Sequence, residues 1–198
     1  MDVPEELPVA GTVVLLRTGA HGMEVLLMRR PERGSFGGAW VFPGGKVEDI
    51  DRMPDSSEAD DARRAGIRET FEEVGLVVSD LVALSRWVPP PEAPRRIRTW
   101  FFVARAAGDD VHAAADEVVE HVWITPAAAL DQHAAGAWTM FPPTWMTLHD
   151  LTTFGDVSAV LAAAGRHRSF ATRVDGTAFV WEGLRLETRE LPWRLRAE

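Results

Sequence analysis

Three glutamates, Glu69, Glu72 and Glu73, lie close together in a segment whose pattern predicts a helix over residues 59–74. Because an α-helix turns by about 100° per residue, their carboxylates share an arc roughly 100° wide. Like charges at these spacings repel one another and destabilise a helix unless a cation lies among them. Mg²⁺ prefers such oxygen ligands and keeps waters that a phosphate can displace. The spacing therefore favours a divalent-cation site, and a solvated surface face is the alternative interpretation.

Capping residues mark both ends of this expected helix. Ser57 precedes it, and an acidic residue follows three positions later in a spacing typical of a capping box. Gly75 follows the helix and is the expected C-cap. Ile67, Phe71 and Val74 fall on the side opposite the carboxylates, so we expect that side to face the core.

A glycine turn upstream of the helix is a second candidate for contact with a metal or a phosphate. The segments before it are two strands of a hairpin (residues 9–17 and 23–29), a loop rich in Gly and Arg (30–38) and a short strand (39–42). The strand ends at Pro43, Gly44 and Gly45. A turn without side chains can bring backbone carbonyls and amides close to a metal or a phosphate. Residues 46–61 are polar and acidic, which predicts an exposed loop before the helix.

The rest of the chain alternates predicted strands and helices. We expect strands over residues 76–88, 99–105 and 118–125, helices over residues 126–132 and 144–164 with an interruption near Gly155, and a β-like piece over residues 177–181. This mixture predicts the α/β (α+β) fold class. We expect a single domain over residues 1–198, with a core at about residues 8–165 and a C-terminal extension at about residues 166–198.

The composition excludes several classes of protein. The chain has 198 residues, of which 46% are hydrophobic, and this is enough for a sizeable core. Its net charge of −9 gives no basic footprint for a nucleic-acid duplex. Without cysteine it has no disulfide framework, thiolate zinc site or cysteine nucleophile. An acidic beginning in place of a basic signal segment, and no apolar run of about 18 residues, favour a soluble, cytoplasmic protein that binds no membrane.

Motifs of several enzyme classes are absent from the sequence. The histidines form no His-Glu-x-x-His spacing, and neither a Gly-x-Ser-x-Gly elbow nor a Walker A loop is present. A serine hydrolase and a P-loop enzyme are therefore excluded.

The helix segment resembles the core of the Nudix box in the run RETFEEVGL, residues 68–76. That box reads Gly, five residues, Glu, seven residues and Arg-Glu-U-x-Glu-Glu-x-Gly-U, where U is a bulky apolar residue. The preceding run WVFPGGKVE, residues 40–48, is similar to the strand and glycine loop of the family. Thr70 replaces the usual aliphatic residue, and the gap before residue 68 is nine residues longer than in the standard box. Glu48 or Asp51 can take the place of the box's first glutamate.

The resemblance implies a Nudix fold, an α/β/α sandwich around a mixed β-sheet, over roughly residues 8–165. It also implies a cofactor, Mg²⁺ or Mn²⁺. The implied metal ligands are a backbone carbonyl and three carboxylates, which are Gly44, Glu69, Glu72 and Glu73. These glutamates act in the family as ligands or as the catalytic base.

Other positions of the box take supporting roles by the same resemblance. Arg68 is implied to be a structural ion-pair partner, and Gly45 and Gly75 are structural glycines. A further catalytic glutamate often comes from a loop after the sheet. Glu117 is our first choice for it ahead of Glu120, and an exposed lead-in to a strand is the alternative interpretation for both.

The activity implied is that of a Nudix pyrophosphohydrolase, which cleaves a diphosphate linked to another moiety. Bound metal lowers the pKa of a water, and a glutamate takes its proton as the water attacks phosphorus. Guanidinium groups bind phosphate with paired donors, and surface solvation is the alternative role for each arginine. The candidates for substrate binding are Arg29, Arg30 and Arg33 in one group and Arg95, Arg96 and Arg98 in another.

The substrate implied is a small nucleoside diphosphate derivative. The features most similar to the subgroup of CoA and acyl-CoA diphosphatases are residues 26–30, the turn FPGG at residues 42–45, the lengthened box and residues 98–102. Four tryptophans are candidates either for stacking on a base or for the core, namely Trp40, Trp87, Trp100 and Trp138. The alternative function is a non-catalytic Nudix-fold module that senses a nucleotide or supports a partner protein, and a homodimer is an open assembly state.

The lengthened box adds an acidic segment before the helix. Residues 49–61 hold six acidic residues against one basic residue, so packing them in the core would strand many charges. We therefore predict a surface excursion. A tolerated loop is one interpretation of its role, and a lid or dimer contact beside the diphosphate site is the other.

Overall fold

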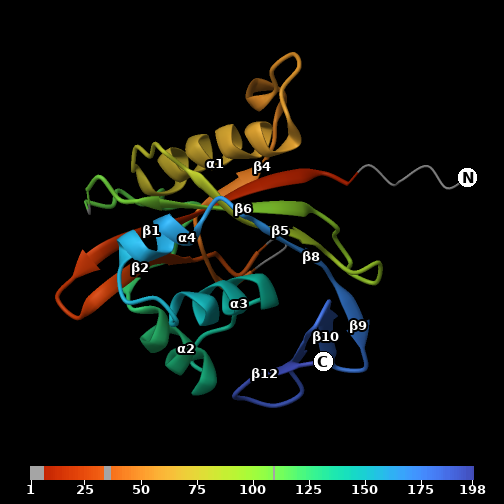
Figure 1. The fold of residues 1–198 in the computed structure, drawn as a ribbon. Coiled ribbons are helices and arrows are strands. Elements are labelled where there is room, and N and C mark those ends of the chain that lie inside the picture. Colours follow the sequence, from red (N-terminus) through yellow and green to blue (C-terminus); the bar gives the residue numbers. More distant parts are fainter. Residues whose placement is uncertain (1–6, 34–36, 109) are drawn as a thin grey trace, which may run out of the picture.

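A mixed β-sheet forms the middle layer of the molecule (Figure 1). The computed structural model describes residues 7–33, 37–108 and 110–198. The eight strands of this sheet are β1 (Val9–Gly19), β2 (Gly22–Arg29), β3 (Trp40–Val41), β4 (Gly44–Lys46), β5 (Val82–Val88), β6 (Arg98–Arg105), β7 (Glu120–Ile124) and β8 (Arg168–Ala171). The main path runs β3-β2-β1-β6-β5-β8, with β4 paired to β1 and β7 paired to β2. The β1–β6 and β5–β8 pairs are parallel, and the others are antiparallel.

Helices cover both faces of this sheet (Figure 1). On one face lies α1 (Glu58–Val74), and on the other lie α2 (Pro126–Ala134), α3 (Pro142–Leu151) and α4 (Val157–Ala163). Consecutive side chains of β6 point to opposite faces of the sheet: Phe102 packs in the cluster on the α1 side, and Phe101 packs in the cluster that contains α3. These three layers confirm the predicted fold class and the α/β/α sandwich.

Small residues allow α1 to lie very close to β1. Ala62, Ala65 and Gly66 are buried on the sheet side of the helix. A Cβ atom on Gly11 of β1 would lie 1.8 Å from the carbonyl oxygen of Ala62, so only glycine fits at this crossing. The position of α1, and of every carboxylate on it, is therefore set by this backbone contact.

This contact turns α1 away from the predicted orientation. Val74 is buried as expected, but Phe71 is 57% exposed and Ile67 is only partly buried. Glu73, which we expected on the polar face, is completely buried. The prediction was wrong because it gave the core side to the largest apolar residues, whereas the smallest residues make the closest contact.

The capping residues of α1 are as predicted, and the helix begins one residue earlier than expected, at Glu58. Ser57 is the N-cap, and its hydroxyl accepts a hydrogen bond from the Asp60 backbone N–H at 3.2 Å. Gly75 is the C-cap and has a φ of 70°, in the left-handed region that glycine adopts without strain. A one-turn 3-10 helix, η1 (Asp49–Asp51), lies between the glycine turn and α1.

Several other predicted elements have different bounds. The strand expected over residues 76–88 begins only at Val82, and the strand expected over residues 118–125 begins at Glu120. The helical stretch expected over residues 144–164 is two helices, α3 and α4, with the predicted break near Gly155. The glycine turn is itself a strand, because residues 44–46 pair with residues 10–12 of β1. The predicted acidic beginning and Arg-rich loop include residues 1–6 and 34–36, which lie outside the described residues.

The C-terminal residues extend the main sheet and add a second one. The second sheet has the order β12-β11-β10-β9 and is antiparallel, with strands β9 (Arg173–Asp175), β10 (Ala178–Trp181), β11 (Leu184–Glu187) and β12 (Arg194–Ala197). Trp181 and Leu186 of this sheet are buried in the same cluster as α3. In β8, Phe170 stacks on Trp87 of β5 at a centroid distance of 4.0 Å. In the described part of the chain, no helix is both long and apolar enough to cross a membrane.

Candidate active site

Three carboxylates from two segments meet beside the second half of α1. Glu69 and Glu73 come from the helix, and Glu117 comes from the connection that leads into β7. One oxygen of each lies within 4.8 Å of the other two, and they form the one group of this kind among the described residues. Glu73 is buried, Glu69 is partly buried and Glu117 is exposed, so the cluster leads from the core to the surface.

Glu72 does not join this cluster. Its side chain is 51% exposed and accepts a hydrogen bond from Arg68 at 2.9 Å. The orientation of α1 that buries Glu73 turns Glu72 toward solvent. The carboxylates that lie together are therefore Glu69, Glu73 and Glu117, whereas the role of Glu72 as a metal ligand stays a prediction.

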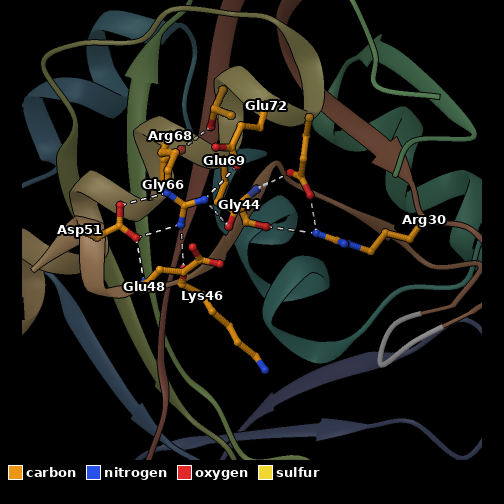
Figure 2. Close-up of polar contacts among 11 residues, drawn as sticks. Arg30, Gly44, Lys46, Glu48, Asp51, Gly66, Arg68, Glu69 and Glu72 are labelled. Atoms are coloured by element: carbon orange, nitrogen blue, oxygen red, sulfur yellow. Dashed lines mark hydrogen bonds and ion pairs between the residues drawn. The ribbon is translucent and has the colours of Figure 1, made fainter. Parts of the chain in front are cut away.

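Both oxygens of the buried Glu73 are hydrogen-bonded. The backbone N–H of Gly44 donates to Oε2 at 2.8 Å, and Nη2 of Arg30 donates to Oε1 at 2.6 Å. The same Nη2 donates to the carbonyl oxygen of Gly44 at 3.1 Å, and Figure 2 shows Arg30 reaching this turn. Burial raises the pKa of Glu73 to about 7, and the charges of Glu69 and Glu117 add to the rise, although Arg30 and the Gly44 N–H oppose it.

The two glycines of the turn make room for this arrangement. Gly44 has a φ of 148°, and a Cβ atom there would lie 2.3 Å from the carbonyl oxygen of Gly11. A Cβ atom on Gly45 would lie 2.2 Å from the carboxyl carbon of Glu69. Residues with side chains would therefore push β4 away from β1 and from the helix. Burial also raises the pKa of Glu69, and the neighbouring Arg68 opposes that rise.

Arg68 links the acidic residues around the turn (Figure 2). It donates to Asp51 at 2.8 and 3.1 Å, to Glu69 at 3.0 Å and to the Lys46 carbonyl at 3.1 Å. Burial alone would raise the pKa of Asp51, but hydrogen bonds from Arg68 and from the Glu48 N–H hold it below the usual value. Of the two candidates for the place of the box's first glutamate, Glu48 and Asp51, it is Asp51 whose carboxylate binds Arg68.

A signal for Asp51 was present in the sequence. Five residues separate it from Gly45, which is the spacing between the first glycine and the first glutamate of the Nudix box. The residues by which this box exceeds the standard Nudix box therefore lie between Asp51 and Arg68. The prediction of an exposed segment holds for residues 52–55 and is wrong for Asp51, which is 4% exposed. Its charge tolerates burial because Arg68 neutralises it.

Backbone hydrogen bonds bring Glu117 to the helix. The N–H groups of His112 and Ala114 donate to the carbonyls of Val74 and Glu73, each at 2.9 Å. These are carbonyls of the last turn of α1, which have no N–H donor within the helix. The chain then turns through a Glu117 N–H bond to the Ala114 carbonyl. A segment distant in sequence is thereby fixed beside the carboxylates of α1.

A pocket of about 300 Å³ opens next to the carboxylate cluster. Its lining includes Arg30, Arg33, Asp116 and Glu117. Arg33 is exposed, and its Nη2 donates to the Asp116 carbonyl at 2.8 Å. The pocket therefore combines two guanidinium groups with one member of the cluster.

The other candidate residues lie outside this pocket. Glu120 lies on β7 and its carboxylate is 3.5 Å from Nε of Arg29, so these two residues form a surface ion pair. Arg98 pairs with Glu58 at the first turn of α1, about 16 Å along the helix axis from Glu69. Arg95 and Arg96 precede it in the β5–β6 connection. This corrects the expectation that both arginine groups flank one site.

The four candidate tryptophans belong mainly to the core. Trp40 is buried and stacks on the partly buried Trp138 at a centroid distance of 3.9 Å. Trp87 is buried in its stack on Phe170. Trp100 is buried, and its indole N–H donates to Glu58 at 2.8 Å. Trp138 is partly buried, whereas the other three are buried.

Comparison with known proteins gives one family. The family model described as NUDIX domain matches residues 7–143, which is more than half of the chain. A curated relative, "Putative nudix hydrolase 7" of Caenorhabditis elegans, is 24% identical over 172 residues. That match covers 67% of this chain and 56% of the relative, so the chain spans little more than half the length of that protein.

Solved structures share the fold at low sequence identity. A NUDIX hydrolase from Alicyclobacillus acidocaldarius is 20% identical with a TM-score of 0.71, and the match covers 81% of this chain and 97% of that one. The NUDIX domain of Shewanella oneidensis NrtR, solved with ADP ribose, is 17% identical with a TM-score of 0.59, and the match covers 75% of this chain and 88% of that one.

Proposed function

Because this chain belongs to the Nudix family, we propose that it is a metal-dependent hydrolase that cleaves the diphosphate linkage of a nucleoside diphosphate derivative. One observation carries this proposal: Glu69, Glu73 and Glu117 lie together beside a pocket lined by Arg30 and Arg33. Carboxylates that share a cation and guanidinium groups that bind phosphate are the two components that this hydrolysis requires.

The donor atoms of the cluster suit Mg²⁺ or Mn²⁺. Glu69, Glu73 and Glu117 offer carboxylate oxygens. The Gly44 carbonyl oxygen lies near Glu73, because both accept a hydrogen bond from the same Arg30 nitrogen. Hard divalent cations prefer such oxygen donors. When bound, the metal would lower the pKa of the attacking water and neutralise phosphate charge.

The side chains around the pocket take the remaining roles. Arg30 and Arg33 bind and orient the diphosphate with paired N–H donors. Glu117 is exposed on the pocket wall, where it is placed to accept the proton that the attacking water loses. Arg68 fixes Glu69, and the Gly44 N–H fixes Glu73, so these two carboxylates keep their positions.

The proposed substrate is CoA or an acyl-CoA. The support for it is a similarity to the CoA diphosphatase subgroup in residues 26–30, 42–45 and 98–102 and in the lengthened box. A CoA derivative is a nucleoside diphosphate carrying a second group, as is ADP ribose, the ligand in the structure of the NrtR domain. Both compounds present the anhydride that the arginines would bind.

The test is hydrolysis of a substrate panel with Mg²⁺ or Mn²⁺. The panel contains CoA, acyl-CoA, ADP-ribose, NADH, dinucleoside polyphosphates and 8-oxo-dGTP. We expect turnover of at least one member, its loss in EDTA, and the highest kcat/KM for CoA or acyl-CoA. Turnover of another member alone would reject the CoA assignment and keep the hydrolase.

Failure of the whole panel would contradict the hydrolase. If folded protein hydrolyses none of the compounds with either metal, calorimetry with the same compounds identifies the alternative. Tight binding that does not depend on metal would indicate a non-catalytic nucleotide-sensing module.

A further inference from the structure

A single nitrogen of Arg30 binds two of the proposed metal ligands. Its Nη2 lies 2.6 Å from Oε1 of Glu73 and 3.1 Å from the carbonyl oxygen of Gly44. The first contact is a charge-assisted hydrogen bond to a carboxylate that is completely buried. A guanidinium group therefore lies between two oxygens that a divalent cation would need.

The surroundings make this position suitable for a cation. Glu69 and Glu117 lie beside Glu73, and the three carboxylates would repel one another without a neutralising charge. Among the described contacts of Glu73, Arg30 supplies that charge. The Arg30 side chain is itself 29% exposed and lines the pocket, so its guanidinium group can move toward the pocket without crossing the core.

We infer that Arg30 competes with the divalent cation for Glu73 and the Gly44 carbonyl, and that it turns into the pocket to bind a phosphate when the cation takes these oxygens. The second half rests on the proposed function, since it requires a phosphate-bearing substrate. The competition has a thermodynamic consequence. Arg30 weakens metal binding in the absence of a phosphate, and a phosphate that binds Arg30 removes this opposition.

An orienting role for Arg30 predicts the opposite sign. If Arg30 served only to hold Glu73 in position for the metal, its removal would weaken metal binding, as happens for groups that support ligands from outside the coordination sphere. Metal affinity without substrate therefore separates competition from orientation.

The experiment measures Mn²⁺ binding by calorimetry and by electron paramagnetic resonance, without substrate and at about pH 8, where Glu73 is ionised. Arg30→Gln is compared with the wild type and with Arg29→Gln, the matched control at the neighbouring position, whose guanidinium group pairs with Glu120 outside the pocket. We expect Arg30→Gln to bind Mn²⁺ on the order of tenfold more tightly, a usual size for coupling between two sites. Arg29→Gln should bind Mn²⁺ like the wild type. Equal or weaker binding by Arg30→Gln would overturn the inference.

A measurement on the wild type keeps the inference testable if Arg30→Gln does not fold. Side-chain ¹⁵N NMR of the arginines, with the Arg30 signal assigned from Arg30→Lys, reports the hydrogen bonds of its guanidinium group. Saturating Mg²⁺ should move the Arg30 signal and leave that of Arg98, at the other end of α1, unchanged. An unchanged Arg30 signal under saturating Mg²⁺ would refute the release.

The phosphate half is tested with pyrophosphate as the probe. In the wild type, pyrophosphate should tighten Mn²⁺ binding by a larger factor than in Arg30→Gln. The reason is that pyrophosphate binds Arg30 and so removes its competition for Glu73, and Arg30→Gln has no such competition to remove. An equal factor in both proteins would remove this half of the inference. Neither binding measurement needs turnover, so a failed substrate panel and a failed inference are distinguishable.

Discussion

Glu117 and Glu120 are three residues apart, but only Glu117 faces the carboxylates of α1. Glu117 shares the cluster with Glu69 and Glu73, whereas Glu120 pairs with Arg29 on the neighbouring strand. We predict that Glu117→Gln lowers kcat by roughly 10²-fold, the usual contribution of a positioned acid or base.

The matched variant Glu120→Gln should keep kcat close to that of the wild type, because its carboxylate lies outside the pocket. Both rates are measured on the best substrate of the panel with saturating Mg²⁺. If Glu120→Gln proved the more damaging change, the assignment of the loop glutamate would be wrong.

The buried Glu73 gives the folded protein a specific pH dependence. Its pKa is raised from 4.5 to about 7 by burial, so the folded state holds this proton where the unfolded state has lost it. Stability therefore falls as pH rises between about 4.5 and 7 and levels off above that range. The lowered pKa of Asp51 acts in a separate window, since its contribution is lost as pH falls below about 3.8.

Glu73→Gln cannot ionise and should remove this part of the slope. Relative to the wild type, the variant should gain up to about 3 kcal/mol between pH 4.5 and 7. Urea unfolding in EDTA at several pH values measures the difference. The raised pKa of Glu69 leaves some slope in both proteins, and parallel profiles for the two would contradict the prediction.

At the scale of elements, η1 and α1 are joined by the ion pair between Asp51 and Arg68. Asp51 is 4% exposed, and the pair fixes the glycine turn against the helix. Asp51→Asn removes the buried charge that accepts two hydrogen bonds from Arg68, while Arg68 keeps Glu69 and Glu72 as partners, so we predict a loss of about 2 kcal/mol in the free energy of unfolding.

Asp49 of the same short helix supplies the control for that variant. It is fully exposed and lies 4.0 Å from Arg52, so Asp49→Asn should change the free energy of unfolding by less than about 0.5 kcal/mol. Chemical denaturation of both variants measures this contrast. Similar losses for the two would show that burial of Asp51 does not matter.

The orientation of α1 shows why pattern analysis succeeded at the ends of this helix and failed along its length. Its caps, Ser57 and Gly75, depend on backbone groups within one turn, so neighbouring residue types predict them. Its buried side depends on Gly11 of β1, which is 51 residues before Ala62 in the chain. Hydrophobicity along the helix contains no information about that contact.

At the scale of the whole molecule, we propose that residues 166–198 belong to the same folding unit as the rest of the chain. Trp181 of β10 is 2% exposed and contacts the stacked pair Trp87 and Phe170 edge-on. We predict that Trp181→Ala costs about 3–5 kcal/mol and lowers the melting temperature of the single main transition by roughly 10 °C.

Val174→Ala is the control from the adjacent strand β9, where the side chain is 41% exposed. It should change stability by less than about 0.5 kcal/mol. Calorimetry of both variants measures the transitions. If Trp181→Ala moved only a separate minor transition, residues 166–198 would be an independent unit.

Local chemistry in the sequence was sufficient for the family resemblance, the fold class and the existence of a carboxylate site. Residues 68–76 have a specific order, and the arc shared by Glu69 and Glu73 follows from helical geometry alone. The resemblance favoured Glu117 over Glu120 as the loop glutamate, but nothing in the sequence indicated how close Glu117 lies to the helix.

The three-dimensional arrangement of distant segments decided which carboxylates lie close together. Glu117, rather than Glu72, lies beside Glu69 and Glu73, because the approach of α1 to Gly11 turned the helix and the hydrogen bond from the Ala114 N–H to its last turn brought the loop near. Arg30 was expected to bind substrate, and the fold also gave it Glu73 as a partner, 43 residues away. Such contacts depend on how closely two backbones approach each other, and neither segment alone encodes that distance.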